Sequence, residues 1–213
     1  MAQPSYSRDE LVSELTSYCE FLTQIYLPPE VIQHPPEGGW EHIPPDFVKS
    51  FCLGKNDTVA DLMKHIPYIR RRKEDDWDPW QIYGNATPVD FTTSMQMSLF
   101  LSLMRACGTI VVADPQTGPK PTRLSDPEAP DGEAWRRFQT YTFREFFSMA
   151  KEMFRKFEMR KHVHCTSPDV PEAQIYREEG VFTERYDRER CMDRLDEYQE
   201  QVNWADREAQ GHE

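Results

Sequence analysis

The first apolar pattern in the chain has the spacing of a helix. Ser7 and Glu10 form the S-x-x-E pattern that caps a helix N-terminus, and Pro28 and Pro29 stop any helix that follows. Between them, apolar side chains recur every three or four residues, at Leu11, Leu15, Tyr18, Leu22, Ile25 and Tyr26. This spacing predicts a helix with one apolar face that packs against the core.

The same pattern is clearest between Thr142 and Phe157. Thr142 and Glu145 form a second capping box, after which large apolar side chains follow the i, i+3, i+4, i+7 spacing. These side chains are Phe143, Phe146, Phe147, Ala150, Met153, Phe154 and Phe157. We predict that this helix is a central pillar of the core.

Two shorter helices are predicted between these long ones. The first begins at Pro45 and ends at Gly54. The second is capped by Thr58 and Asp61 and ends before Pro67, with apolar positions at Val59, Leu62, Met63 and Ile66. The segment that follows the first long helix, "LPPEVIQHPPEGGWEHIPPDF", residues 27–47, contains six prolines and two glycines. We therefore expect it to be an extended or turning connection on the surface.

The clearest β pattern is "GTIVVADPQTGPKPTRL", residues 108–124. The β-branched run at its start predicts a strand, and residues 114–118 predict a turn. The remainder predicts a polar return strand that ends at Leu124. Because Pro119 and Pro121 cannot donate ladder hydrogen bonds, the return strand should lie at a sheet edge. Further strands are expected at "WQIY" and "VDFTT", residues 80–83 and 89–93.

The stretch from Met95 to Gly108 is apolar on almost every side. This composition predicts a buried helix with Gly108 at its C-cap. The competing interpretation is a buried strand, because a short apolar run fits either structure.

These elements together predict an α+β fold, with helices packed on a small, mostly antiparallel sheet. We expect residues 1–182 to form a single domain and residues 208–213 to be a disordered tail. Between them, residues 183–207 predict a peripheral, highly charged helix. Its thin apolar seam consists of Tyr186, Met192, Leu195, Tyr198 and Val202, so it lies on the domain or projects toward a partner.

Composition narrows the range of partners. The formal net charge of −12 over 213 residues repels phosphate backbones and anionic lipids, so we expect neither nucleic acid nor membrane as a partner. No apolar stretch approaches the ~20 residues that span a bilayer. The 5 cysteines are scattered without a C-x-x-C pair, which is typical of a reducing compartment. We therefore predict a cytoplasmic protein, and "RRRK" at residues 70–73 leaves nuclear import open.

The segment "KHVHC", residues 161–165, concentrates side chains that can bind zinc. His162, His164 and Cys165 lie within four residues, but the paired spacing of zinc modules is absent and four basic residues precede them. Residues i and i+2 share a side only on an extended chain. The favoured interpretation is therefore a helix end, and a metal site is the alternative.

No motif for catalysis or cofactor binding stands out. The chain contains no G-x-S-x-G, P-loop or G-x-G-x-x-G sequence, although the isolated Cys52, Asp61 and His65 could converge in the fold. We predict no catalytic residues, no bound cofactor and no metal ligands.

The segment "DDWDPWQIY", residues 75–83, combines carboxylates with aromatic rings. Such a composition can hold a cationic or amphipathic ligand through charge and cation–π contacts. The alternative is that the tryptophans cover the edge of a core. The candidate partner-binding residues are Asp75, Asp76, Trp77, Asp78, Trp80 and Tyr83.

Two stretches resemble known proteins. "IPPDFVKSFCLG", residues 43–54, resembles the entry segment of the SMI1/KNR4 (SUKH) superfamily, and the predicted hairpin and closing helix follow in that superfamily's order. "LGKNDTVADLMKHIPYI" and "FREFFSMAKEMFRKFE" are similar to a group of uncharacterised filamentous-fungal proteins. The first resemblance spans residues 43–157 and implies protein binding, as in bacterial immunity proteins and fungal regulatory modules, with no catalytic residues.

These observations lead to two functional hypotheses. The first is a non-catalytic protein-interaction or regulatory module of SMI1/KNR4-like type, which binds another protein through the segment around Trp77 and Trp80 and through the charged helix. The alternative is a small metal-dependent hydrolase that uses His162, His164 and Cys165. The sequence does not choose an oligomeric state.

Overall fold

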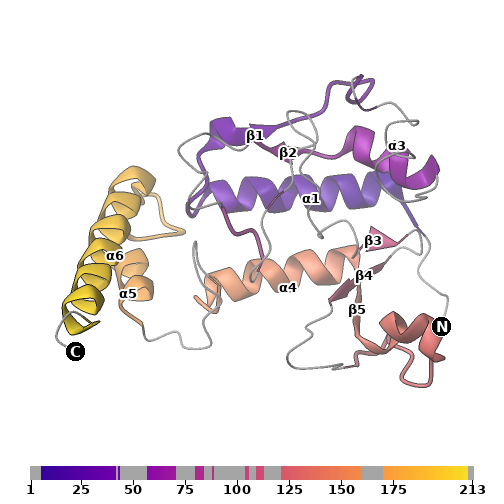
Figure 1. Cartoon of the computed structure of the whole chain (residues 1–213). Coiled ribbons are helices and arrows are strands. Elements are labelled where there is room, and N and C mark those ends of the chain that lie inside the picture. Colours follow the sequence, from indigo (N-terminus) through magenta and orange to yellow (C-terminus); the bar gives the residue numbers. More distant parts are fainter. Residues whose placement is uncertain are drawn as a thin grey trace.

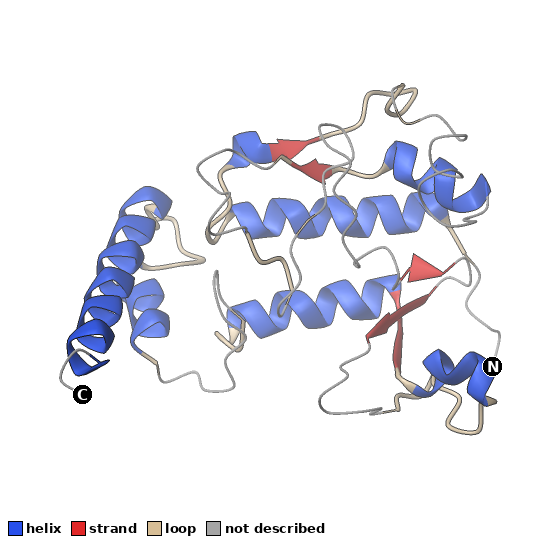
Figure 2. Cartoon of the chain, viewed as in Figure 1, coloured by secondary structure: helices blue, strands red, loops and turns tan. Residues whose placement is uncertain are grey.

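The computed structural model describes residues 6–41, 43, 57–70, 80–83, 88, 104–105, 109–112, 121–159 and 170–210. Helices form most of the regular structure in these residues, and the short strands form antiparallel sheets (Figure 2). The fold class is therefore α+β, as predicted. The predicted helix at residues 45–54 and the predicted strand at residues 89–93 lie outside the described residues.

Helix α1 (Arg8–Thr23) begins where the sequence predicts. The Ser7 side chain accepts a hydrogen bond of 3.3 Å from the backbone N–H of Glu10, which satisfies one of the donors left free at a helix start. Its buried side chains are Leu11, Tyr18, Cys19, Phe21 and Leu22. The chain then turns through residues 24–28 into a short 3₁₀ helix, Pro29–Val31.

Helix α4 (Phe143–Arg155) confirms the second predicted capping box. The Thr142 hydroxyl accepts from the Glu145 N–H at 3.3 Å, and the Thr142 N–H donates to the Glu145 carboxylate at 2.9 Å. The helix ends in a left-handed residue, Phe157, with φ of 60°. The Glu158 N–H then donates to the Met153 carbonyl at 2.8 Å, which completes a Schellman C-cap.

Helices α1 and α4 lie side by side and form the centre of the molecule (Figure 1). Their contacts advance along both helices in the same direction, so the two helices run parallel. The ring pairs are Tyr6 with Phe143, Tyr18 with Phe147 and Phe21 with Phe154, with centroids 6.4, 5.3 and 6.4 Å apart. Aromatic packing thus joins the two helices that the sequence predicts best.

A second layer covers the side of α1 that faces away from α4 (Figure 1). It contains helix α3 (Asp57–His65) and a two-stranded sheet of β1 (Ile32–Gln33) and β2 (Tyr68–Ile69). Helix α3 starts one residue before the predicted cap, so Thr58 lies in its first turn. The sequence predicted no strand at β1 or β2, because each is only two residues long.

The three-stranded sheet corrects the predicted hairpin. Strand β4 (Thr109–Val112) pairs with β3 (Met104–Arg105) and with β5 (Gln139–Thr142), in the order β3-β4-β5. Residues 121–124 form a loop and turn rather than a return strand. Strand β5 takes that place and continues into α4. The 3₁₀ segment Asp131–Arg137 precedes β5.

Strand β3 also corrects the predicted helix at residues 95–108. Met104 pairs with Ile110 and Arg105 with Thr109, so the end of the apolar run is a strand in a hairpin. The strand interpretation is right for these two residues. Residues 95–103 and 106–108 lie outside the described part of the chain.

The C-terminal region is a pair of helices, α5 (Pro171–Glu179) and α6 (Arg188–Gln210), called the α5–α6 pair below. The pair stands beyond one end of α1 and α4 (Figure 1). Helix α5 was not predicted, and α6 runs to Gln210 rather than ending at Arg207. Residues 208–210, expected in a disordered tail, are therefore helical.

Candidate functional site

The predicted partner-binding segment is only partly described. Asp75, Asp76, Trp77 and Asp78 lie outside the described residues. Trp80 is buried, with 7% of its surface exposed, and its ring lies 6.2 Å from that of Tyr26. Tyr83 is half-buried, with its ring 5.0 Å from that of Phe146. The expectation that Trp80 is an exposed binding aromatic is wrong, because it belongs to the core.

Two buried tyrosines of the α1 region explain why this segment folds inward. The Tyr18 hydroxyl donates to the Ile82 carbonyl, and the Tyr26 hydroxyl donates to the Gln81 carbonyl. Burial raises the pKa of both phenols well above the ordinary value, so both stay protonated donors. The sequence interpretation treated these tyrosines only as apolar positions and missed their hydroxyls as anchors. The predicted strand at residues 80–83 is wrong: these residues are a largely buried loop, with a single bridge residue at Tyr83, held against the α1 region.

The candidate metal ligands His162, His164 and Cys165 lie outside the described residues. Within the described ranges, no group of three or more His, Cys, Asp or Glu side chains converges as a metal site would require. No observation on the described residues therefore favours the hydrolase alternative.

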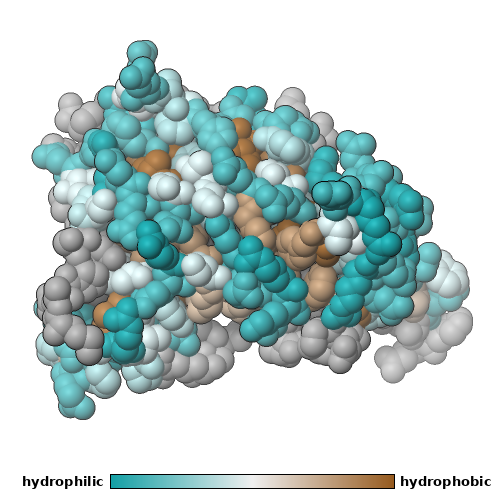
Figure 3. All heavy atoms as spheres, turned by 180° about the vertical axis from the view of Figure 1, so that it is seen from behind, coloured by the Kyte–Doolittle hydropathy of each residue, from teal (hydrophilic) through white to brown (hydrophobic). Residues whose placement is uncertain are grey.

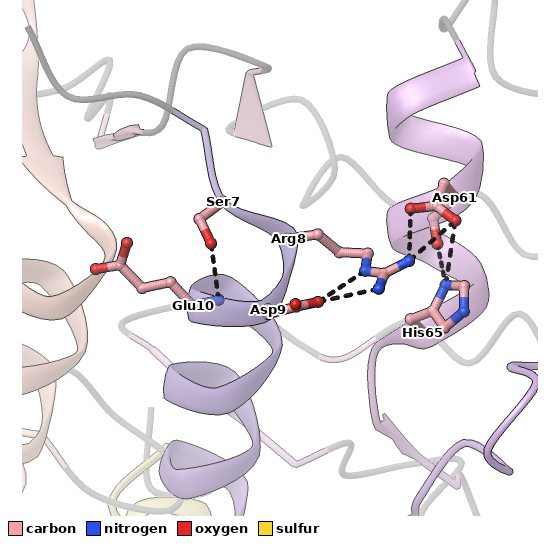
Figure 4. A network of polar contacts seen from close by, with 6 residues as sticks. All are labelled: Ser7, Arg8, Asp9, Glu10, Asp61 and His65. Atoms are coloured by element: carbon pink, nitrogen blue, oxygen red, sulfur yellow. Dashed lines mark hydrogen bonds and ion pairs between the residues drawn. The ribbon is translucent and has the colours of Figure 1, made fainter.

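Asp61 and His65 do converge, as the sequence allowed, and Arg8 joins them (Figure 4). The His65 Nδ1 lies 2.7 Å from the Asp61 backbone carbonyl and 3.4 Å from its carboxylate. The Arg8 guanidinium donates to the same carboxylate at 3.1 Å and also pairs with Asp9 at 3.0 Å. The hydrogen bonds to Asp9 and Asp61 raise the pKa of Arg8. The third candidate, Cys52, lies outside the described residues.

The geometry of this cluster indicates a structural role. A His–Asp pair that activates a nucleophile needs the far ring nitrogen, Nε2, open toward that nucleophile. Here Gly39 lies close to that nitrogen, since a Cβ added at Gly39 would be 3.1 Å from His65 Nε2. The Asp61 carboxylate is shared with Arg8, which comes from α1. The cluster therefore ties the start of α1 to α3.

Cys19 and Cys191 are buried free thiols. Burial raises the pKa of Cys19 to about 12 and that of Cys191 to about 11. Because only the thiolate is nucleophilic, neither residue is suited to covalent catalysis at neutral pH.

We expect Cys19 and Cys191 to resist iodoacetamide at pH 8 in the folded protein. A pKa of about 12 leaves roughly one thiol in ten thousand ionised at that pH, and burial limits access further. Peptide mass spectrometry after timed alkylation measures the modified fraction, with the guanidinium-unfolded chain as control. Full native labelling as fast as in the unfolded chain would contradict the burial of both thiols.

The α5–α6 pair is held by a buried carboxylate. The side chain of Glu179 on α5 is 3% exposed and contacts two arginines of α6. Arg190 lies 3.1 Å from the Glu179 carboxylate, and Arg194 lies 2.5 Å from it. Arg194 also forms an ion pair with Glu178 at 2.8 Å. The bonds to Glu178 and Glu179 raise the pKa of Arg194, and the Arg194 guanidinium lowers the pKa of Glu178. This ion cluster fixes the orientation of α6.

Helix α6 buries only one side, and chiefly in its first half. Cys191, Met192 and Leu195 are buried, and Tyr198 and Val202 are half-buried. Of the predicted seam, Tyr186 lies before the helix, where its hydroxyl donates to the Ile25 carbonyl. The seam thus joins α6 to the domain, and the other side of the helix is left to solvent.

The solvent side of α6 carries Trp204, which is 61% exposed. Trp204 is on the side of the helix opposite the buried seam, since it follows Val202 by two residues, or about 200° of helical rotation. With Glu197, Glu200, Gln201 and Ala205 it lines a shallow surface hollow. The other strongly exposed large apolar side chain in the described residues is Phe182, 39% exposed, whose ring stacks on Phe21 at 5.7 Å.

The surface behind the view of Figure 1 is mostly hydrophilic (Figure 3). Hydrophobic residues reach the surface near its middle, beside the teal helix at the right, which is α6. The loop from α5 to α6 packs on α1 through Phe182 and Tyr186. Phe182 and Tyr186 therefore contact other parts of the fold, whereas Trp204 has no ring contact in the described residues.

Comparison with protein-family models, curated proteins and solved structures gives no match to this chain. Among the described helices, none combines the length and apolar character needed to cross a bilayer. The resemblances seen in the sequence therefore stay predictions.

Proposed function

We propose that this chain is a non-catalytic protein-interaction module of SMI1/KNR4-like type, whose contact surface is the solvent side of α6 around Trp204. A single observation carries this proposal: Trp204 exposes 61% of its surface on a helix whose opposite side is buried. Tryptophan is among the residues most enriched at the energetic centres of protein interfaces. A large exposed ring on a fixed helix costs apolar hydration unless a partner covers it.

The ion cluster of Glu179 supports this function because it holds α6 in one orientation. A helix fixed by Arg190 and Arg194 presents its outer side without first having to order itself, which lowers the entropic cost of binding. The SMI1/KNR4 resemblance implies the same class of function on separate grounds. The partner is proposed to be a protein, in the cytoplasm or nucleus, because the charge of −12 disfavours nucleic acid and anionic lipid.

A photo-cross-linking amino acid placed at Trp204 tests the proposal in cells of the source organism. We expect it to trap one or a few partner proteins, because a central interface residue lies in contact with its partner. The matched control carries the same amino acid at Gln199, which is also exposed on α6 but lies about 140° around the helix. Equal trapping from both positions, or none from Trp204, would overturn the assignment of this surface.

The substitution Trp204→Ala should weaken binding of the trapped partner by about 30-fold or more, since buried tryptophans at interface centres contribute 2 kcal/mol or more. Titration by calorimetry of the purified pair measures this loss. Gln199→Ala is the control and should change the affinity less than threefold. Circular dichroism should be the same for both variants, because Trp204 contributes nothing to the buried seam. Unchanged affinity for Trp204→Ala would contradict its central role.

A further inference from the structure

A continuous line of carboxylates runs along the same side of α6 as Trp204. Each member follows the previous one by three or four residues, which places all of them on one side of a helix. Every member is exposed. This acidic stripe consists of Glu189, Asp193, Glu197, Glu200, Trp204 and Glu208.

The stripe is long enough to receive a helical segment. From Glu189 to Glu208 it extends about 29 Å, at a rise of 1.5 Å per residue. The hollow beside Trp204 lies near the C-terminal end of the stripe, where Glu200 is about one turn and Glu197 about two turns before the ring. The ring and two carboxylates thus face the same small volume.

The bases of α6 leave most of this negative charge unbalanced. Arg190 and Arg194 bind the buried Glu179 on the other helix, so both are already paired, and the exposed Arg207 offsets part of the charge near the C-terminal end of the stripe. Glu189 pairs with Arg188 at 3.6 Å, whereas no ion pair joins Asp193, Glu197 or Glu200 to another described residue. The five carboxylates of the stripe, spaced along one exposed side, therefore create a local negative potential within a chain that is already acidic.

A second copy of this chain does not suit the stripe. A symmetric dimer would place the same surface on both partners, so carboxylates would face carboxylates across the contact. Opposite charge across the contact is what the stripe requires. A lysine or arginine of the partner above Trp204 would gain cation–π attraction and the charge of Glu197 and Glu200 together.

On these observations we infer that the partner of the α6 surface is a basic amphipathic helix of another protein, with a lysine or arginine seated between Trp204, Glu197 and Glu200. This inference rests on the proposed function and adds the chemistry of the partner. Complementary charge sets the register, and the Trp204 ring supplies the apolar centre of the contact.

Synthetic helical peptides test the inference on the full chain. Two peptides of equal length carry the same apolar positions, with lysine and arginine at the polar positions of one and glutamate at those of the other. Binding is followed by the indole N–H signal of Trp204 in ¹H–¹⁵N spectra, assigned with Trp204→Phe. We expect the basic peptide alone to shift this signal, with an affinity that falls as salt is raised.

Charge reversal separates a specific site from general attraction. The double substitution Glu197→Lys/Glu200→Lys should lower the affinity for the basic peptide at least tenfold and allow the acidic peptide to bind. The control Glu37→Lys/Glu128→Lys changes the net charge equally at two exposed residues, one in the loop beside α3 and one just before the segment Asp131–Arg137, and should change affinity less than threefold. Equal losses in the two variants would reduce the effect to overall charge and overturn the inference.

The two proposals fail in distinguishable ways. If position 204 traps a partner but the basic and acidic peptides bind alike, the interaction module stands and the basic partner is wrong. If position 204 traps nothing and neither peptide shifts the Trp204 signal, both proposals are wrong.

Discussion

The double substitution Arg190→Ala/Arg194→Ala should lower the free energy of unfolding by about 3–5 kcal/mol, the usual loss when a buried charge loses its partner. The Glu179 side chain is 3% exposed and would lose both of its cations. Arg190 and Arg194 are 69% and 38% exposed, so removing them opens little of the core. The loss would therefore come from the stranded carboxylate. Denaturant unfolding measures the total, and hydrogen exchange shows whether α5 and α6 open first.

A rescue experiment identifies the cause of that loss. Adding Glu179→Leu to the double variant should recover most of the stability, because a buried apolar side chain of similar size needs no counter-ion. Arg207→Ala, on an exposed arginine of the same helix, should change stability by less than about 0.5 kcal/mol. A triple variant no more stable than the double would show that the carboxylate is not responsible.

The long helices were predictable because their signals are local. The capping box of Thr142 and Glu145 and the aromatic spacing after it lie within one short segment, and both appear unchanged in α4. The same holds for Ser7 and α1. Helix α5 has local signals too, with Pro171 at its start and Gly180 in the left-handed conformation at its end. These were overlooked because the helix is only nine residues long and mostly polar.

Pairing between distant segments was not predictable from local pattern. Strand β4 was recognised, but its distant partner β5 is set by the segments that the α1–α4 packing brings near. Strand β3, its hairpin neighbour, lies in an apolar run that also fits a helix. Trp80 was named as a partner-binding residue because carboxylates precede it, and the alternative, that it covers the edge of the core, agrees with its burial. The segment of Trp80 is held in place by hydrogen bonds from Tyr18 and Tyr26 to the backbone carbonyls of Ile82 and Gln81. Because every residue has a backbone carbonyl, the sequence does not show which ones will accept such bonds.

The candidate site also combines features that local sequence predicts with features that depend on distant residues. The charged helix and its apolar seam were predicted, and so was the idea that it meets a partner. The burial of Glu179 rather than its neighbour Glu178 could not be predicted. It depends on Arg190 and Arg194, which lie 11 and 15 residues after Glu179 in the chain. The exposure of Trp204 became clear only once the seam on the opposite side was known to be buried.

Phe147→Ala should lower the free energy of unfolding by about 3–5 kcal/mol, the range for deleting a buried phenylalanine ring. Phe147 is 2% exposed, and its ring lies 5.3 Å from that of Tyr18 and 5.2 Å from that of Phe146. It therefore fills the contact between the two central helices, where neither can shift far to close a cavity. Phe147→Leu should cost less, because it leaves a smaller cavity. Ser148→Ala, exposed on the same helix, is the control for helix propensity.

The effect of Phe147→Ala should also reach residues 80–83. Tyr18 contacts Phe147 with its ring and holds the Ile82 carbonyl with its hydroxyl, so a looser ring weakens that anchor. We expect faster hydrogen exchange in a peptide that covers residues 80–83, and a red shift of the Trp80 fluorescence measured in a chain whose other tryptophans are replaced by phenylalanine. A Phe147→Ala protein as stable as the Ser148→Ala control would contradict the central position of this ring. Loss of stability without any change at residues 80–83 would show that Tyr18 holds the segment independently of α4.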